Sequence, residues 1–317
     1  MDVSQNVSAK PERSPHSFLH TLLRFFSWLT SNRKMTFGAC ILGFFILMAL
    51  IGPLFVGQDP NYLSSDLLQP PSLHHLLGTT SKGEDILAQL VYGARISLLV
   101  GFLSALGSTV LQILFGLLAG YFSGTVDNIL SLIINVFLVL PGLPLGIVVA
   151  SFAPASLKGP VLITLLLLFT SWSYGARVLR SQTLSVCQRD FVEAARSSGE
   201  WSFRIIFFEI LPNEISIVAS SFVGTFVYTI AAEVAFEFLG LGDPGRISWG
   251  VMLFWAQSQQ AMLANAWWWF VPPGLCVSLL CAGLAFLNNG MDELANPRLR
   301  VEKPPRVERA RKEVEAQ

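Results

Sequence analysis

Two glutamates stand inside one of the apolar stretches of this chain. Glu233 and Glu237 are four residues apart, which places both carboxylates on one face of a helix. A carboxylate at membrane depth is costly to bury and by default indicates a functional site. We therefore predict that both line a translocation pathway, and that Glu237 gives it negative character that favours solutes with a free amino group. The alternative is that both side chains reach the membrane interface and are solvated.

Other residue types capable of chemistry form no convincing site. His74 and His75 are adjacent, so their side chains point apart and make a poor metal pair. The four cysteines include no C-x-x-C pair and have no histidine partner at metal spacing. The chain also has no G-x-x-x-x-G-K-[ST] phosphate loop. We predict no catalytic residue, no metal site and no cofactor held by this chain, which would make it a non-enzyme.

Composition indicates what holds these residues. Of 317 residues, 52% are hydrophobic and 13% are charged. The apolar residues form blocks near the ~20 residues that cross a ~30 Å hydrocarbon core. We predict an all-α polytopic membrane protein with six transmembrane helices, at about 35–56, 94–121, 126–152, 159–174, 215–238 and 267–288.

Polar segments divide the chain into three parts. Residues 1–34 form a predicted cytoplasmic N-terminal segment, 35–290 the transmembrane domain and 291–317 a cytoplasmic basic tail. Apolar residues recur at helical spacing over 18–29, which indicates either an interfacial amphipathic helix or an extension of the first span. Six spans place both ends and the loop at 179–214 on one side, and the concentration of Lys and Arg there predicts that this side is the cytoplasm.

Glycine and proline punctuate the second and third predicted spans. Gly116, Gly120 and Gly124 repeat at four-residue intervals, a spacing that lets a neighbouring membrane helix approach closely. Pro141 and Pro144 remove backbone donors near the middle of the third span. Such a break is tolerated where other helices or a cavity satisfy the freed carbonyl groups. Both prolines are therefore predicted to line a translocation pathway, with a packing kink as the alternative.

A polar insertion at about 179–214 separates the fourth and fifth predicted spans. Its distinctive residues, in chain order, are Glu193, Ala194, Ala195, Gly199, Leu211 and Pro212. Glycine most easily adopts a left-handed turn, so Gly199 is predicted to join two short helices. Ala194 and Ala195 offer a surface without bulk for a partner's backbone, and Pro212 is predicted to end the second helix.

This insertion resembles the EAA loop of binding-protein-dependent ABC importers, the cytoplasmic loop by which a membrane subunit grips its ATPase. Over about 34–300 the chain also resembles the peptide and nickel importer permeases, above all the C-type subunit of dipeptide and oligopeptide systems. The matching runs are Leu77-Gly78-Thr79, Tyr92-Gly93-Ala94-Arg95-Ile96-Ser97-Leu98, Ala119-Gly120-Tyr121-Phe122, Leu140-Pro141-Gly142-Leu143, Phe238-Leu239-Gly240-Leu241-Gly242, Ser248-Trp249-Gly250 and Pro297-Arg298-Leu299. The resemblance implies the type I permease fold of ABC importers, coupled to its ATPase through the insertion.

The resemblance implies partners and a solute as well. The complex would contain a second permease, two ATP-binding subunits that hold ATP and Mg, and an extracytoplasmic substrate-binding protein. It would lie in a bacterial or archaeal inner membrane and would bind no nucleic acid. The implied solute is a di- or oligopeptide, and nickel or another small solute is the alternative. An ion-gradient-driven secondary transporter is a second class, but it would be expected to show internal repeats with paired broken helices, whereas one predicted span is clearly broken.

Three departures from the family pattern stand out. Thr80 follows the Leu-Gly-Thr run where an Asp is frequent, and Glu84 stands where an Arg is frequent. The usual G-D-G-L-R-D ending is replaced by Asn288-Asn289-Gly290-Met291-Asp292-Glu293. These changes bear on the outer mouth and the last helix, not on the fold.

Overall fold

The computed structural model describes residues 32–57, 59–154 and 157–295. The predicted amphipathic helix at 18–29, most of the predicted tail at 291–317 and the Pro297-Arg298-Leu299 run lie outside these residues. The described elements are α2 (Arg33–Val56), α3 (Ile86–Tyr121), α4 (Thr125–Val139), α5 (Gly142–Phe152), α6 (Pro160–Thr170), α7 (Ser173–Val186), α8 (Asp190–Ser197), α9 (Ser202–Arg204), the π-helix η2 (Ile205–Ile210), α10 (Leu211–Phe238), α11 (Trp249–Ser258) and α12 (Trp267–Ala295).

Within the described residues, five helical segments are long and apolar enough to cross a membrane. They are Arg33–Val56, Ile86–Tyr121, Pro160–Val186, Ser202–Phe238 and Trp267–Glu293. Helices α4 and α5 meet at an angle of 84° and supply a sixth span if the bent pair is counted as one. The prediction of an all-α polytopic membrane protein is confirmed.

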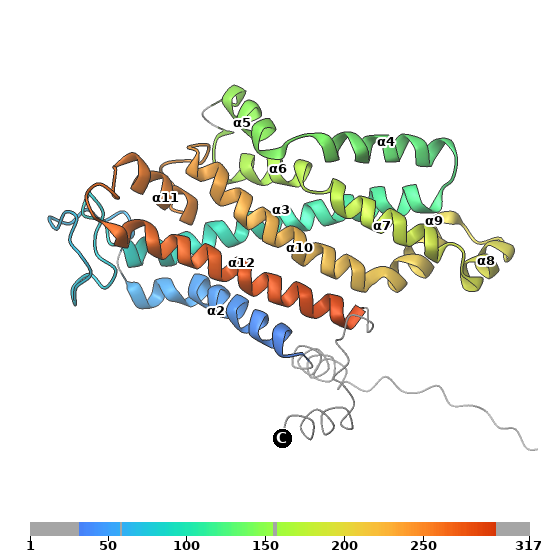
Figure 1. Cartoon of the computed structure of the whole chain (residues 1–317), viewed down its shortest axis with the longest axis horizontal. Helices are drawn as coiled ribbons and strands as arrows, with labels where there is room; N and C mark the ends of the chain where they lie inside the picture. The colour runs from blue at the N-terminus through green and yellow to red at the C-terminus, as the bar shows by residue number, and fades with distance from the viewer. Residues whose placement is uncertain (1–31, 58, 155–156, 296–317) are drawn as a thin grey trace, which may run out of the picture.

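The helices pass back and forth along the long axis of the molecule (Figure 1). The start of α2 and the end of α12 lie side by side, where Lys34 Nζ is 2.5 Å from Glu293 Oε1. Both lie on the half of the molecule that carries α8 and α9, whereas α11 and the segment before α3 lie at the opposite end. The start of α2 and the end of α12 thus share a side with the insertion, and the orientation of the two ends of the chain stays a prediction.

The glycine repeat brings α3 and α7 into close contact. A Cβ added at Gly116 would lie 2.7 Å from Leu179 Cβ, and one added at Gly120 would lie 2.5 Å from Thr183 Cβ. Any larger residue would push the helices apart, so the predicted close approach is confirmed for these two positions. Gly124 has a different role: its φ of +74° belongs to the turn between α3 and α4, and no described atom lies within 4 Å of an added Cβ.

Three predicted span limits are wrong, and all fell short. The fifth span begins at Ser202 instead of about 215. The second span begins at Ile86 instead of about 94, because the Asp85 side chain accepts a hydrogen bond from Ala88 N at 2.9 Å and caps the helix. The fourth span continues from α6 through α7 to Val186 instead of ending near 174. The charge of Arg180 does not stop the helix, because its guanidinium pairs with Asp127 of α4 through contacts of 2.7 and 2.8 Å.

Candidate functional site

The predicted coupling insertion forms a helical hairpin at one end of the bundle. Helix α8 ends at Ser197, and Gly199 follows with a φ of +75°. The turn is closed by hydrogen bonds from Gly199 N to Arg196 O at 3.0 Å and from Glu200 N to Ala195 O at 3.2 Å. The predicted left-handed turn at Gly199 is confirmed, and glycine adopts it without the steric cost that a Cβ would bring.

One face of the hairpin is anchored in the bundle and the other is open. Val192, Ile205 and Ile206 are fully buried and pack with Leu117 of α3. Glu193 and Ala194 are exposed, and Ala195 is partly buried against the same cluster. Ala194 therefore lies on the open face and Ala195 at its boundary with the anchored face. A partner could contact the open face.

Three charged residues of the hairpin have partners within the chain. The Arg196 guanidinium lies 4.8 Å from the centre of the Tyr121 ring at the end of α3. Arg204 and Glu200 form an ion pair across the start of the second helical piece. The first contact links the hairpin to α3, and the second lies within the hairpin.

The prediction that Pro212 ends the second helix is wrong. Helical structure runs without a gap from Ser202 to Phe238, and the turn before the proline is a π-helix over Ile205–Ile210. In this wider turn Leu211 N donates to Ile206 O, five residues back. Pro212 itself lies exposed in the first turn of α10. The π-turn accommodates the missing donor, as π-bulges commonly do at functional positions.

The break in the third predicted span is confirmed. Helix α4 ends at Val139, Pro141 caps α5, and the two helices bend by 84°. Leu140 is extended, with φ −65° and ψ 122°, as expected for a residue that precedes a proline. Pro144 lies within the first turn of α5, where its missing N–H has no intrahelical partner to lose.

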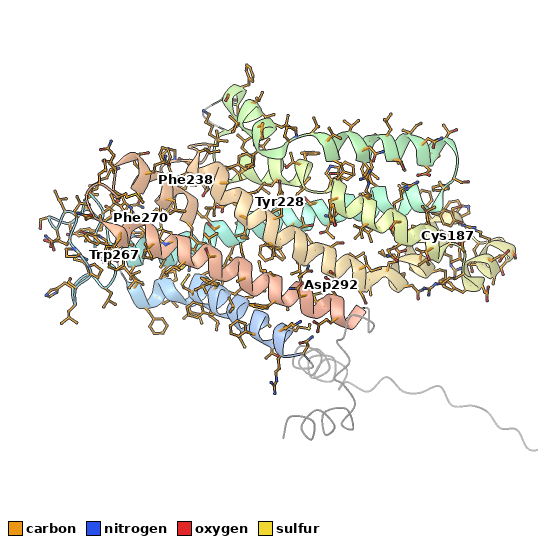
Figure 2. All side chains as sticks on the ribbon, viewed as in Figure 1. Cys187, Tyr228, Phe238, Trp267, Phe270 and Asp292 are labelled. Atoms are coloured by element: carbon orange, nitrogen blue, oxygen red, sulfur yellow. The ribbon has the colours of Figure 1, made fainter. Side chains whose placement is uncertain are left out.

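A cavity of about 610 Å³ lies beside this break. It is lined by residues of α4, α5, α6, α7, α10 and α12, and Figure 2 shows Tyr228 near the middle of the bundle and Asp292 nearer the end that carries α8. The described residues that line it are Phe137, Leu138, Leu140, Gly142, Thr170, Ser171, Ser173, Tyr174, Gly175, Val178, Ile217, Ser220, Ser221, Gly224, Thr225, Tyr228, Asn288 and Asp292. Pro141 and Pro144 are not in this set, although Leu140 and Gly142 beside them are.

The structure places Glu233 and Glu237 elsewhere. Their exposed fractions are 0% and 2%, so the alternative that they are solvated at the interface is wrong. Glu233 accepts a hydrogen bond from Ser97 Oγ of α3 at 3.1 Å, and Glu237 accepts one from Ser248 at the start of α11. The pair joins α3, α10 and α11, and neither glutamate belongs to the described lining of the cavity. Their role in a pathway stays a prediction.

Sequence reasoning missed the polar residues that do line the cavity. Ser220 of α10 donates toward Asn288 Oδ1 at 3.1 Å and toward Asp292 Oδ1. The only indication in the sequence was the polar run at 288–293, which stands at the end of the last span in place of the usual G-D-G-L-R-D. A polar side chain near the end of an apolar helix is ordinarily read as an interfacial residue, so the signal was weak.

His75 lies in the loop before α3, at the end opposite the hairpin. Its Nδ1 is 2.9 Å from Asp85 Oδ2 and its Nε2 is 3.4 Å from Asp66 Oδ2. The hydrogen bond to Asp85, assisted by Asp66, raises the pKa of His75 above its usual value. Among the described residues, no three His, Cys, Asp or Glu side chains gather in a way that could hold a metal ion.

Comparison with known proteins assigns the chain to a family. Residues 112–301 match the sequence model described as "Binding-protein-dependent transport system inner membrane component". The chain belongs to this family. Residues 23–71 also match the N-terminal transmembrane domain of oligopeptide transport permease C. The first match begins within α3 and includes both the hairpin and the cavity, so the two candidate regions belong to the part that this inner membrane component shares with its family.

Similar curated proteins of the family carry peptide transport names. The dipeptide transport system permease protein of Bacillus subtilis is 34% identical over 278 residues, covering 86% of this chain and 84% of the relative. The dipeptide transport system permease protein of Alkalihalophilus pseudofirmus is 31% identical over 278 residues, covering 87% and 89%. The di/tripeptide transport system permease protein of Pseudomonas aeruginosa is 30% identical over 289 residues, covering 88% and 93%. The predicted resemblance to peptide ABC permeases is confirmed.

Proposed function

We propose that this chain is a permease subunit of an ATP-driven ABC importer for di- or oligopeptides. It would form half of the translocation pathway together with a second permease. Two ATP-binding subunits would bind ATP and Mg and grip the hairpin, and an extracytoplasmic substrate-binding protein would deliver the solute. The hairpin, both ends of the chain and the ATPases would lie on the cytoplasmic side of the inner membrane.

The observation that carries the coupling role is the geometry of the hairpin. Glu193 and Ala194 are exposed, and Ala194 adds little bulk, while Val192 and Ile205 hold the same unit against α3. A rigid element with one face anchored and one face open can pass a partner's movement into the bundle. The peptide substrate is supported by the names of the relatives.

A pair of matched variants tests the coupling role. Gly199 and Gly57 both have a positive φ, at +75° and +60°, and no described atom lies within 4 Å of a Cβ added at either. Tryptophan at either position therefore meets the same left-handed strain of about 1–2 kcal/mol and open space around it. The positions differ in place, because Gly57 follows α2 at the end of the molecule opposite the hairpin.

The assay is an affinity pull-down of the tagged chain from detergent-solubilised native membranes. We expect wild type and Gly57→Trp to recover an ATPase and a second permease, and Gly199→Trp to lose the ATPase alone. Recovery of equal ATPase by both variants would refute the coupling role. Failure of wild type to recover any ATPase, even after mild crosslinking, would remove the importer proposal as a whole.

Uptake into proteoliposomes that contain the complete complex tests the solute. ATP-dependent accumulation of a labelled dipeptide is the expected result. Accumulation of Ni²⁺ without any accumulation of the dipeptide would replace the peptide by nickel. Uptake that follows an imposed ion gradient and needs no ATP would move the chain to the class of secondary transporters.

A further inference from the structure

The cavity carries an isolated negative charge. Among the described residues that line it, Asp292 is the only one with a charged side chain, and the rest are apolar groups, hydroxyl groups, glycines and the Asn288 amide. The nearby Lys34 ammonium lies 2.5 Å from Glu293, the next residue along α12. Among the described ion pairs, Asp292 has no cationic partner. Its charge therefore acts on whatever occupies the cavity.

The hydrogen bonds around Asp292 leave most of its carboxylate available. The Ser220 hydroxyl has one proton and lies within reach of both Asn288 Oδ1 and Asp292 Oδ1. An ionised carboxylate has about four acceptor sites, so one serine proton satisfies a quarter of them at most. The Asn288 carbonyl oxygen is a further acceptor on the same side of the cavity. The Asn288 amide also carries two N–H donors, so it is the charge of Asp292 that favours a cation at this end of the cavity.

We propose that Ser220, Asn288 and Asp292 form an anionic subsite that binds the ammonium group of the solute during translocation. An ammonium group carries three donors, which matches the acceptors supplied by Asp292 and Asn288. The volume of about 610 Å³ lies within the range of about 300–1,000 Å³ that is usual for small-molecule sites. The inference rests on the proposed function, because it names the part of a peptide that the pathway recognises.

Electrostatics favours Asp292 over the two glutamates for this role. Glu233 and Glu237 are buried against serines of α3 and α11, outside the described cavity lining. Asp292 is half-buried in the cavity wall, where bulk water screens a charge less than it does on an open surface. The subsite therefore places a preference for a free amino group at Asp292, and the role predicted for Glu237 stays a prediction.

The experiment compares uptake of lysyl-alanine, glutamyl-alanine, dialanine and N-acetyl-dialanine by the complete complex in proteoliposomes. Asp292→Asn removes the charge and keeps the shape, whereas Asp292→Glu keeps the charge. Asn288→Asp adds a second charge at the same place. Ser221→Ala is the control, since it changes the same cavity wall without changing its charge. All variants use the same binding protein, so its own selectivity cancels in ratios taken against wild type.

We expect Asp292→Asn to lower the uptake ratio of lysyl-alanine to glutamyl-alanine by roughly three- to tenfold, the range for a partly screened charge pair. The advantage of dialanine over its acetylated form should fall in parallel. Asn288→Asp should raise both ratios, and Asp292→Glu and Ser221→Ala should leave them near wild type. Unchanged ratios in Asp292→Asn, or in Asn288→Asp if the first variant does not assemble, would overturn the subsite. Absence of peptide uptake by wild type would instead overturn the proposed function.

Discussion

Replacement of Gly120 by alanine measures how closely α3 and α7 pack. A Cβ at this position would lie 2.5 Å from Thr183 Cβ and 2.9 Å from the backbone oxygen of Arg180. Carbon atoms in good contact are about 3.5–4.0 Å apart, so the helices would have to separate by about 1 Å. The backbone of α7 cannot yield as the tip of a flexible side chain would, so the overlap is not cheaply relieved.

The expected free-energy change is the difference between two effects. Overpacking of a close contact costs about 1–3 kcal/mol. Alanine is favoured over glycine inside a helix by about 1 kcal/mol, which offsets part of that cost. Gly120→Ala should therefore destabilise the protein by up to about 2 kcal/mol. Gly43→Ala supplies the control, because Gly43 also lies inside a helix but no described atom lies within 4 Å of an added Cβ.

The assay is thermal unfolding of the purified protein in detergent, followed by fluorescence and by loss of the monodisperse elution peak. We expect Gly120→Ala to melt below wild type and Gly43→Ala to melt at or above it. If Gly120→Ala melts at or above wild type while Gly43→Ala behaves as expected, then α3 and α7 are not in the contact described here. The role of the glycine repeat would then have to be reassigned.

Two further predictions follow from charged contacts. Because its partners raise the pKa of His75, the stabilisation of the loop before α3 is fully present below the unfolded-state pKa of about 6.5 and is lost as pH rises through the higher folded-state value. Amide hydrogen exchange in residues 59–85 should therefore speed up with pH by more than the intrinsic pH dependence of exchange. A His75→Gln variant that still shows this additional increase in the exchange rate would contradict the prediction. Breaking the two-point contact of Asp127 with Arg180 should destabilise the protein by about 1–3 kcal/mol. A thermal-melt double-mutant cycle of Asp127→Asn and Arg180→Gln that gives no coupling would show that the pair is solvated.

Features set by a few neighbouring residues were predicted well. The presence of each span, and most of the individual span limits, follow from the length of an apolar block, because a helix of ~20 apolar residues satisfies its own backbone in the membrane. Pro141 breaks its span because a proline lacks a backbone donor, and Gly199 turns left-handed because it lacks a Cβ. Each of these outcomes depends on the residue itself more than on what packs against it.

The errors arose where packing overrides local preference. Helix α7 continues past the predicted end of its span because Asp127 of α4 neutralises Arg180. Pro212 does not stop its helix because the π-turn before it absorbs the missing hydrogen bond. Helix α11 lies between the fifth and sixth predicted spans, where no helix was predicted, and its Trp249 is fully buried and donates from Nε1 to Leu90 O of α3 at 3.0 Å. Asp127 and Leu90 are distant in sequence from the residues they contact, whereas the π-turn directly precedes Pro212.

The sequence by itself determined the class of the protein, its family and the position of the helical hairpin. Its periodicity also placed Glu233 and Glu237 on one face of a helix, but it could not say what that face would meet. Only the tertiary structure decided that they meet serines of α3 and α11, and that Asp292 borders the cavity. A helix fixes the relative directions of its own side chains, whereas the surroundings of each side chain depend on helices that are distant in the chain.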